Sequence, residues 1–536
     1  MAEADLETHG FDPVERTAIQ GSEHMDGREV QELSYSKAAR WTSDNAEWHS
    51  TYLDRVSQLV ERFKNFTCIV FWSLGNEAFY GQNHAAMYRW IKSSKRGILP
   101  DFVMYATPDE LVQHVKENPD RALIQCEYGH AMGNEPVSVR LEKDKIIFKN
   151  HYDFADLSHL VASWHLVGET GDTTPTPLEL LITLPGEESA VDFPSPPNDF
   201  RGETWLSIHI FLKNETVWAP QGHEVAWSQM LLSKPQASGL APVIGNRDLV
   251  LSLQEFPGKL VVSWPSLDQP FDIDLVSGNL TWANEKGTVL SKGPELSLYR
   301  ALTQNDLGFG GDGKEWSKFR VAEASTHIQC FTWSVNEDHT VTVKAAVRVA
   351  PPVLEWACDA DITYTLGFGA ISIHVKGGFS GTVPKHIPRL GLTMSLPKVY
   401  NKATWFGRGP GESYRDKKEG ARFGRWSASI EDLQTKYEWP QENGNRSDVR
   451  WVRIESGNAT LLACMDVPLN FSLRKYSLED LDKSLHPYEL TELDETVCNL
   501  DFAHHGIGSG SCGPLAFEGD RLETKSFEFR TLLKVV

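Results

Sequence analysis

Two glutamates lie beside continuous apolar runs of the sequence. Glu77 follows one run, and Glu127 lies near the end of another. The first run is CIVFWSL at 68–74, closely followed by Asn76 and Glu77, and the second is ALIQCEY at 122–128. Runs of this kind are expected of strands that are buried on both faces of a parallel sheet. Carboxylates at the C-terminal ends of two such strands could serve a retaining glycosidase, which needs its two carboxyl groups about 5–5.5 Å apart. Taken singly, each glutamate is also compatible with a solvated loop residue.

Helical patterns surround these runs. One helix is predicted at 50–65, with Thr51 and Asp54 at N-cap positions. Its apolar residues recur on one helical face: Leu53, Val56, Leu59, Val60 and Phe63. A second helix is predicted at 84–94. The order helix, strand, loop, helix, strand over residues 1–134 is typical of a βα-barrel or a doubly wound fold.

After about residue 135 the pattern becomes alternating or β-branched. It does so in the segments KIIFKN, TWLSIHIFL, KLVVSW, TVTVKAAVRV and AISIHVKG. No long amphipathic helix pattern separates them, which favours antiparallel sandwiches. The Pro-, Asp- and Gly-rich stretches 184–203 and 235–247 are predicted to be long loops or a boundary. We therefore predict a small sandwich at 135–243 and a large sandwich at 244–536.

Composition limits the classes of partner. The 536 residues are enough for three or four domains, and the net charge of −21 argues against nucleic acid or an anionic membrane surface. No apolar run approaches the ~18 residues of a membrane span. The N-terminal sequence lacks the apolar stretch of a signal peptide. The 7 cysteines include no CxxC pair, which favours reduced thiols. We therefore predict a cytoplasmic protein.

Together with their flanking residues, the two glutamates form two motifs that are more specific than either glutamate alone. SLGNE at 73–77, followed by CEYGHAMGN at 126–134, resembles the acid/base and nucleophile motifs of family 2 glycoside hydrolases, in particular the large β-galactosidases. The resemblance implies that Glu77 is the general acid/base and Glu127 the nucleophile. It also implies that Asn76 holds the 2-hydroxyl of the sugar.

Three further short motifs resemble the same family. The pair MY resembles one whose tyrosine contacts the nucleophile, which implies substrate-binding roles for Met104 and Tyr105. His130 resembles a substrate-binding histidine. The segment ETHG resembles a magnesium-binding segment, and it implies a Mg²⁺ site whose ligands are Glu7, His9 and Glu77. Oxygen ligands suit this ion.

The resemblance extends to the C-terminus. WAPQGHEVAWSQMLL at 218–232 resembles the end of an immunoglobulin-like linker domain. The segments LYRALTQNDLG, WFGRGPGESYRD and YEWPQENGNRSDVRW resemble signatures of the large terminal sandwich. Without the family, PQENGNR is also compatible with simple structural turns. Cys512 stands where some members carry a tryptophan at the active-site rim, and it is better interpreted as a small buried hydrophobe.

Parts of the family pattern have no counterpart in this sequence. These parts include the N-terminal jelly roll, the first linker sandwich, the first barrel strands, and the stretch expected between AMGN and EPVSVRL. A (β/α)8 (TIM) barrel needs at least ~200 residues. We therefore predict an incomplete barrel of roughly three or four strands at 1–134. It is followed by an immunoglobulin-like sandwich at 135–243 and a large antiparallel sandwich at 244–536. A sodium site is predicted to be lost, and Asn134–Glu135 is predicted to be a seam.

Two functional hypotheses remain open. The first is a retaining β-galactosidase that cleaves terminal β-D-galactosides such as lactose. The second is a catalytically inactive truncated product that acts at most as a carbohydrate-binding or assembly sandwich. The related β-glucuronidases and β-mannosidases share the two glutamates but lack the long terminal sandwich. A β-galactoside sugar is the predicted partner, and a homo-oligomer is compatible with the sequence.

Overall fold

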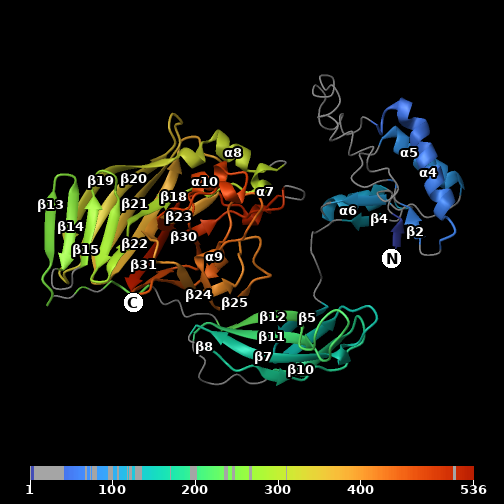
Figure 1. Ribbon diagram of the computed structural model, residues 1–536, viewed down its shortest axis with the longest axis horizontal. Helices are drawn as coiled ribbons and strands as arrows, with labels where there is room; N and C mark the ends of the chain where they lie inside the picture. Colours follow the sequence, from blue (N-terminus) through green and yellow to red (C-terminus); the bar gives the residue numbers. More distant parts are fainter. Residues whose placement is uncertain are drawn as a thin grey trace. The chain divides into compact units, whose positions relative to one another are not determined.

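The computed structural model forms two compact units, Met1–Met132 and Gly133–Val536 (Figure 1). It describes the following residues: 2–4, 42–66, 69–72, 74, 81–94, 101–104, 108–117, 119, 123–126, 136–169, 171–193, 202–233, 240–243, 245, 248–264, 269–308, 311–510 and 515–536.

The first unit combines parallel strands with helices. Its strands are β1 (Ala2–Ala4), β2 (Ile69–Trp72), β3 (Asp101–Met104) and β4 (Leu123–Cys126). Its helices are η3 (Ala46–Trp48), α4 (His49–Phe63), α5 (Gln82–Ser94) and α6 (Pro108–Glu117). β1 pairs with β2 and β3 pairs with β4, in both cases in parallel. The strands expected at 68–74 and 122–128 and the helix expected at 84–94 are confirmed as β2, β4 and α5.

The apolar face of α4 forms the core of this unit together with α5. Tyr52, Val56 and Val60 of α4 are buried against Trp72 of β2 and Met87 of α5. This arrangement follows from the 3.6-residue period of the apolar side chains. The helix predicted at 50–65 is therefore confirmed with slightly different bounds.

The predicted capping residues of this helix are wrong. Thr51 and Asp54 lie inside α4, whose N-cap is Trp48 without a side-chain hydrogen bond. The physical reason is the preceding turn η3, which leads directly into α4. The cap of that turn is Asn45, whose side chain accepts the backbone N–H of Glu47 at 3.0 Å.

The first sandwich, as we call residues 137–233, has two sheets around one core. One sheet has the order β10–β6–β5, with β5 (Val137–Glu142), β6 (Lys145–Asn150) and β10 (Glu188–Asp192). The other has the order β12–β11–β7–β8, with β9 paired to β7; its members are β7 (Leu160–Gly168), β8 (Gly171–Asp172), β9 (Thr176–Leu178), β11 (Thr204–Leu212) and β12 (Glu224–Ser233). The turn η4 (Leu157–His159) precedes β7. The stretch 184–203, predicted to be a long loop or a boundary, contains β10, which pairs with β6, so the prediction is wrong for residues 188–192.

The second sandwich, as we call residues 252–535, is larger. One five-stranded sheet runs β13 to β17 in order: β13 (Ser252–Phe256), β14 (Lys259–Trp264), β15 (Gln269–Asp274), β16 (Leu280–Asn284) and β17 (Gly287–Leu290). Another has the order β18–β23–β30–β29–β26: β18 (Lys292–Ser297), β23 (Arg389–Pro397), β30 (Glu495–His504), β29 (Leu469–Arg474) and β26 (Arg446–Val449).

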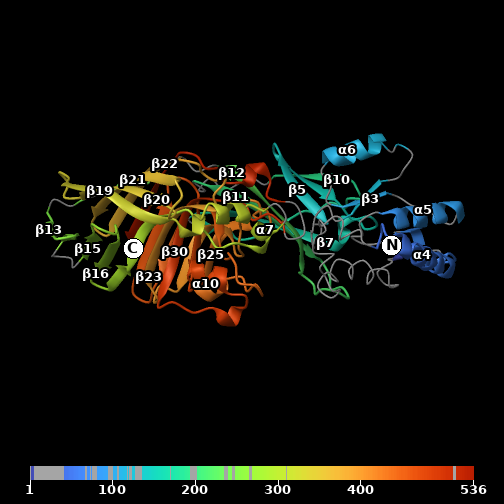
Figure 2. The same ribbon diagram turned by 90° about the horizontal axis from the view of Figure 1, so that it is seen from above.

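A nine-stranded sheet completes the second sandwich, and its layers can be followed in Figure 2. Its order is β19 (Ser325–Val335), β20 (Val341–Ala350), β21 (Ala357–Gly367), β22 (Ala370–Ser380), β31 (Phe527–Val535), β28 (Thr460–Met465), β27 (Trp451–Glu455), β24 (Lys402–Gly409) and β25 (Arg422–Ser429). Side chains from all three sheets form one continuous core. The strand pairs described within 137–535 are all antiparallel, in contrast to the first unit.

Short helices lie in the loops of the second sandwich. They are α7 (Gln304–Leu307), α8 (Gly313–Lys318), η6 (Val321–Glu323), α9 (Ile430–Leu433), α10 (Leu478–Lys483), η7 (Pro487–Glu489) and η8 (Glu518–Asp520). The sandwich boundary predicted at 243/244 stays a prediction. The seam predicted at Asn134–Glu135 lies outside the described residues.

The two sandwiches are joined by a specific contact at Phe423 of β25. Its ring stacks on Trp205 of β11 with the centroids 4.5 Å apart. Its backbone N–H donates to Oε1 of Gln229 at 2.6 Å, and its carbonyl oxygen accepts from Nε2 of the same side chain at 2.8 Å. Glu203, with 2% of its surface exposed, pairs with Arg450 across the same boundary.

We expect Gln229→Ala to weaken this junction. The change leaves one half-buried N–H and one carbonyl of Phe423 without protein partners, which costs about 1–3 kcal/mol. Urea unfolding should show the loss as a lower midpoint. The exposed Gln254 of β13 offers a matched control, since its amide only contacts Ser252 of the same strand at 3.5 Å. An equal effect of Gln254→Ala would contradict a specific role for Gln229.

Candidate active site

The strands that carry the two predicted catalytic glutamates are present. β4 ends at Cys126, directly before Glu127 in the sequence. β2 ends at Trp72, shortly before Asn76 and Glu77. The glutamates and Asn76 themselves lie outside the described residues, so their side-chain positions stay predictions.

The register of β3 and β4 relates two of the predicted site residues. Met104, the last residue of β3, is the partner of Cys126, the last residue of β4. Because the strands are parallel, Met104 and Cys126 lie at the same end of the pair, and Tyr105 and Glu127 are the residues that follow them in the sequence. Met104 belongs to a described strand, whereas Tyr105 and Glu127 lie outside the described residues, as does His130. The register thus aligns the residues that precede Tyr105 and Glu127, and the proximity of these two residues stays a prediction.

The pairing of β1 with β2 relates the predicted metal ligands in the same way. Ala4 at the end of β1 is the partner of Trp72 at the end of β2. The sequence after β1 contains Glu7 and His9, and the sequence after β2 contains Glu77. These three residues also lie outside the described residues. The described part of the chain contains no group of three or more His, Cys, Asp or Glu residues that could hold a metal ion.

Helix α5 follows the Glu77 segment, and its start is fixed by buried polar contacts. The side-chain amide of Asn83 donates to the carbonyl oxygens of Thr42 and Asn45, both at 2.8 Å. The next residue, His84, packs edge-on against the ring of Tyr52. Burial lowers the pKa of His84 to about 4, although Asp44 opposes the shift, so its imidazole is neutral at pH 7. These contacts hold α5 against α4 without introducing a buried charge.

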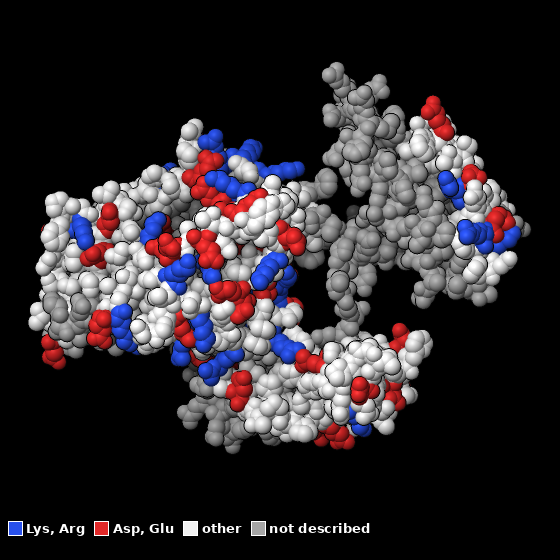
Figure 3. Space-filling model, viewed as in Figure 1, with Lys and Arg blue, Asp and Glu red and all other residues white. Residues whose placement is uncertain are grey.

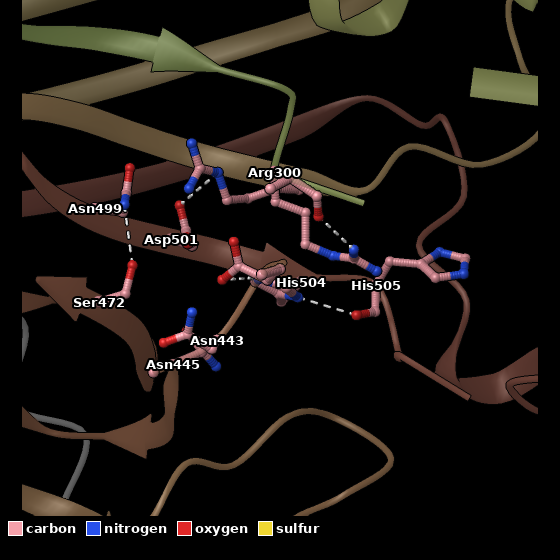
Figure 4. A network of polar contacts seen from close by, with 12 residues as sticks. Arg300, Asn443, Asn445, Ser472, Asn499, Asp501, His504 and His505 are labelled. Atoms are coloured by element: carbon pink, nitrogen blue, oxygen red, sulfur yellow. Dashed lines mark hydrogen bonds and ion pairs between the residues drawn. The ribbon is translucent and has the colours of Figure 1, made fainter. Parts of the chain in front are cut away.

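A second polar cluster, which the sequence did not predict, lies in the second sandwich (Figure 4). Arg300 follows β18 and is fully buried. Its Nη1 and Nη2 atoms lie 2.6 and 3.1 Å from the two carboxylate oxygens of Asp306 in α7. Asp306 also accepts the backbone N–H and the hydroxyl of Thr303, the N-cap, at 2.7 and 2.8 Å. This bidentate pair therefore fixes α7 to the sheet.

More buried charges continue this cluster. Glu442 lies 3.3 Å from Arg474 of β29, and Asp501 of β30 lies 3.5 Å from Arg389 of β23. Burial raises the pKa of the Asp501 carboxyl to about 7 and lowers that of the His504 imidazole. The paired charges link the loops at this end of the second sandwich to its strands, which indicates a structural role for the cluster.

The surface of the described residues carries mixed charge. On the face shown in Figure 3, acidic and basic side chains are interspersed over the second sandwich. This face therefore lacks the continuous basic stripe that nucleic acid selects. No helix among the described residues has the length and apolar character needed to cross a membrane.

Three family models match consecutive parts of the chain. Residues 1–99 match the TIM barrel domain of family 2 glycosyl hydrolases. Residues 146–233 match domain 4 of β-galactosidase, and residues 266–533 match the β-galactosidase small chain. All three matches are thus to domains of family 2 glycosyl hydrolases or of β-galactosidases.

Curated relatives agree with these matches. The β-galactosidase of Kluyveromyces lactis is 28% identical over 617 residues, which cover 98% of this chain and 59% of the relative. The β-galactosidase of Vibrio cholerae is 25% identical, with 99% of this chain and 60% of the relative covered. This chain belongs to the β-galactosidase family within the family 2 glycoside hydrolases. It spans 59% and 60% of the length of these two relatives.

The similarity to solved structures is too weak to indicate a fold. A putative aldose 1-epimerase from Escherichia coli matches 54% of this chain at 9% identity, with a TM-score of 0.27. That score is too low to support a shared fold.

Proposed function

We propose that this chain is a retaining β-galactosidase that cleaves terminal β-D-galactosides such as lactose. Family membership supports the reaction class. The observation that carries the proposal is the parallel register of β3 and β4, whose final residues Met104 and Cys126 are partners. It favours a site at the strand ends where Tyr105 and Glu127 follow.

In the proposed mechanism, Glu77 and Glu127 share the work of a two-step displacement. Glu77 protonates the glycosidic oxygen while the carboxylate of Glu127 attacks the anomeric carbon and forms a covalent glycosyl-enzyme. Glu77 then removes a proton from water, which attacks the same carbon and releases galactose. Asn76 binds the 2-hydroxyl, Tyr105 orients Glu127, and Met104 and His130 complete the contacts with the sugar.

We also propose that Glu7, His9 and Glu77 bind Mg²⁺. Two carboxylates and one imidazole are a chemically reasonable donor set for this ion when water completes its shell. The parallel pairing of β1 with β2 supports the proposal, since the segments that contain the ligands follow, in the sequence, two strands that end at the same end of the pair. When bound, the ion would supply positive charge beside Glu77.

Removal of Mg²⁺ by EDTA is expected to lower galactosidase turnover at least about tenfold, and added Mg²⁺ should restore it. The reason is that the bound ion would fix the position of the Glu77 side chain beside the substrate. His9→Ala should reproduce the loss and raise the Mg²⁺ concentration needed for half-maximal activity. Activity that is unchanged after exhaustive EDTA treatment would contradict this metal site.

An alternative function is that of a non-catalytic chain whose sandwiches bind carbohydrate or support assembly. One observation favours it. The four strands described within Met1–Met132 form two separate pairs, whereas a complete barrel has eight neighbouring strands. Catalytic carboxylates need accurate positioning by their surroundings.

Hydrolysis of a chromogenic β-galactoside by the purified full chain tests the two functions. Turnover above the rate of buffer alone, with retention of the β configuration in the first product seen by NMR, would support the proposed galactosidase. Absence of turnover at all Mg²⁺ concentrations would exclude it for this chain and leave the non-catalytic function.

A further inference from the structure

A cavity of about 400 Å³ opens in the second sandwich. Three segments form its walls: residues 430–443, which contain α9 and the following loop; residues 475–481, at the start of α10; and residues 487–492, which contain η7. Its volume is within the range of natural small-molecule sites. The cavity belongs entirely to the second unit and uses none of the residues proposed for galactoside cleavage.

The apolar part of the lining contains two tyrosine rings. Tyr437 and Tyr476 line the cavity together with Leu481 and Pro440. The Tyr437 hydroxyl donates to the carboxylate of Glu412 at 2.5 Å, and this hydrogen bond fixes the orientation of the ring. Aromatic rings fixed in this way offer a flat, apolar contact surface at low entropic cost.

The polar part of the lining is rich in amides whose positions are also fixed. Gln434 Nε2 donates to the carbonyl oxygen of Leu473 at 2.6 Å. The side-chain oxygen of Asn443 accepts the backbone N–H of Thr435 at 3.2 Å. Gln441 lines the same cavity. Each amide keeps capacity to donate or accept further bonds, which suits hydroxyl groups because these also do both.

The charges around the cavity nearly balance. Lys475 pairs with both Glu431 and Glu492, which leaves a net charge of only −1 on these three groups. The two other charged residues of the lining, Glu438 and Lys436, have opposite signs and are exposed. A lining without strong net charge selects a neutral ligand, since an ionic ligand would lose hydration without gaining a counter-charge.

We propose that this cavity binds a neutral saccharide at a site separate from the barrel. The apolar face of a pyranose ring would pack on Tyr476 and Tyr437, while its hydroxyls bond to the amides of Gln434, Gln441 and Asn443. Flat rings, amides and low net charge occur together here, and this combination matches a ligand with one apolar face and a hydroxylated rim.

A larger cleft in the same sandwich suits a sugar less well. This cleft, of about 850 Å³, is lined by Tyr299 and by the charged pairs Lys292–Glu295 and Glu479–Lys483. The amide groups that distinguish the smaller cavity are nearly absent from its lining, which contains Asn279 alone of this type.

Fluorine NMR of the full chain labelled with 3-fluorotyrosine tests the proposal at the level of single residues. Signals of Tyr476, Tyr105 and Tyr488 are assigned from the Tyr→Phe variants. Methyl β-D-galactopyranoside and methyl β-D-glucopyranoside are titrated to about 50 mM, because weak sugar sites have millimolar dissociation constants. We expect the Tyr476 signal to shift and saturate with at least one of them. Tyr488, which is 82% exposed and does not line the cavity, should not shift.

Variants make the result specific. Gln441→Ala removes one of the amides proposed to bind the sugar hydroxyls and should weaken the titration roughly three- to tenfold. Glu438→Ala changes an exposed rim residue with no proposed bond to the sugar, so it serves as the control and should leave the apparent affinity within about twofold. Glu127→Gln should leave the Tyr476 titration unchanged even if the barrel site fails. The proposal is overturned if Tyr476 does not respond to either sugar, if only Tyr105 responds, or if Gln441→Ala has no effect on the apparent affinity.

Discussion

Replacement of Glu127 by glutamine is expected to reduce hydrolysis of a chromogenic β-galactoside by roughly 10⁴-fold or more. The amide of glutamine cannot form the ester bond to the anomeric carbon that the proposed mechanism requires. Glu127 directly follows β4, and the change adds no bulk, so the strand pairing of β3 and β4 should persist. The expected result is thus a loss of kcat with little change in the unfolding midpoint.

The matched control is Glu47→Gln, the same chemical change at an exposed position next to α4. It should leave turnover within about twofold of the unchanged chain. Mass spectrometry of the protein incubated with a slow 2-fluorogalactoside gives a second readout. A glycosyl adduct should form on the unchanged chain and be absent from Glu127→Gln. An adduct at another residue, or equal turnover of both variants, would contradict the assignment of Glu127.

Strong local patterns made many strands predictable. The windows KIIFKN and TWLSIHIFL correspond to β6 and β11, because alternating or β-branched residues fit a sheet with one buried face. In contrast, β3 was not predicted as a strand, since DFVM offers a window of four residues. Helix α6 was also missed, although Pro108 at its first position is a typical start signal.

The candidate site, too, was only partly predictable from the sequence. Motifs predict Tyr105 and Glu127 as neighbours, and the register pairs Met104 with Cys126, the residues directly before them. Side-chain geometry depends on the surrounding packing, which no short motif contains. The buried cluster around Arg300 and Glu442 could not be predicted. Charged residues are mostly exposed. The partner that permits burial of Glu442 is Arg474, which is 32 residues further along the chain, and no motif relates the two. Most of PQENGNR forms a loop, and its last residue, Arg446, begins β26. Glu442 in this loop is buried and pairs with Arg474.

The largest loss of stability is expected from Asp306→Ala. Arg300 has no exposed surface. After this change, its guanidinium keeps one hydrogen bond of those described, to the carbonyl oxygen of Ala301 at 3.0 Å. A buried charge that loses its partner costs about 3–5 kcal/mol. The N–H and hydroxyl of Thr303 lose their acceptor as well, which removes the capping box of α7. Urea unfolding followed by circular dichroism should show this loss as a lower midpoint.

Two comparisons separate the buried pair from a general effect of removing an aspartate. Asp274 also accepts backbone N–H groups, those of Val276 and Ser277 at 2.8 Å, but it is exposed. Asp274→Ala should therefore cost only about 1 kcal/mol. The double change Arg300→Met with Asp306→Leu should recover much of the lost stability, since it removes both charges together and keeps apolar volume. If Asp306→Ala and Asp274→Ala lower stability equally, then burial of the charge does not determine the cost, and the pair is no more than a helix cap.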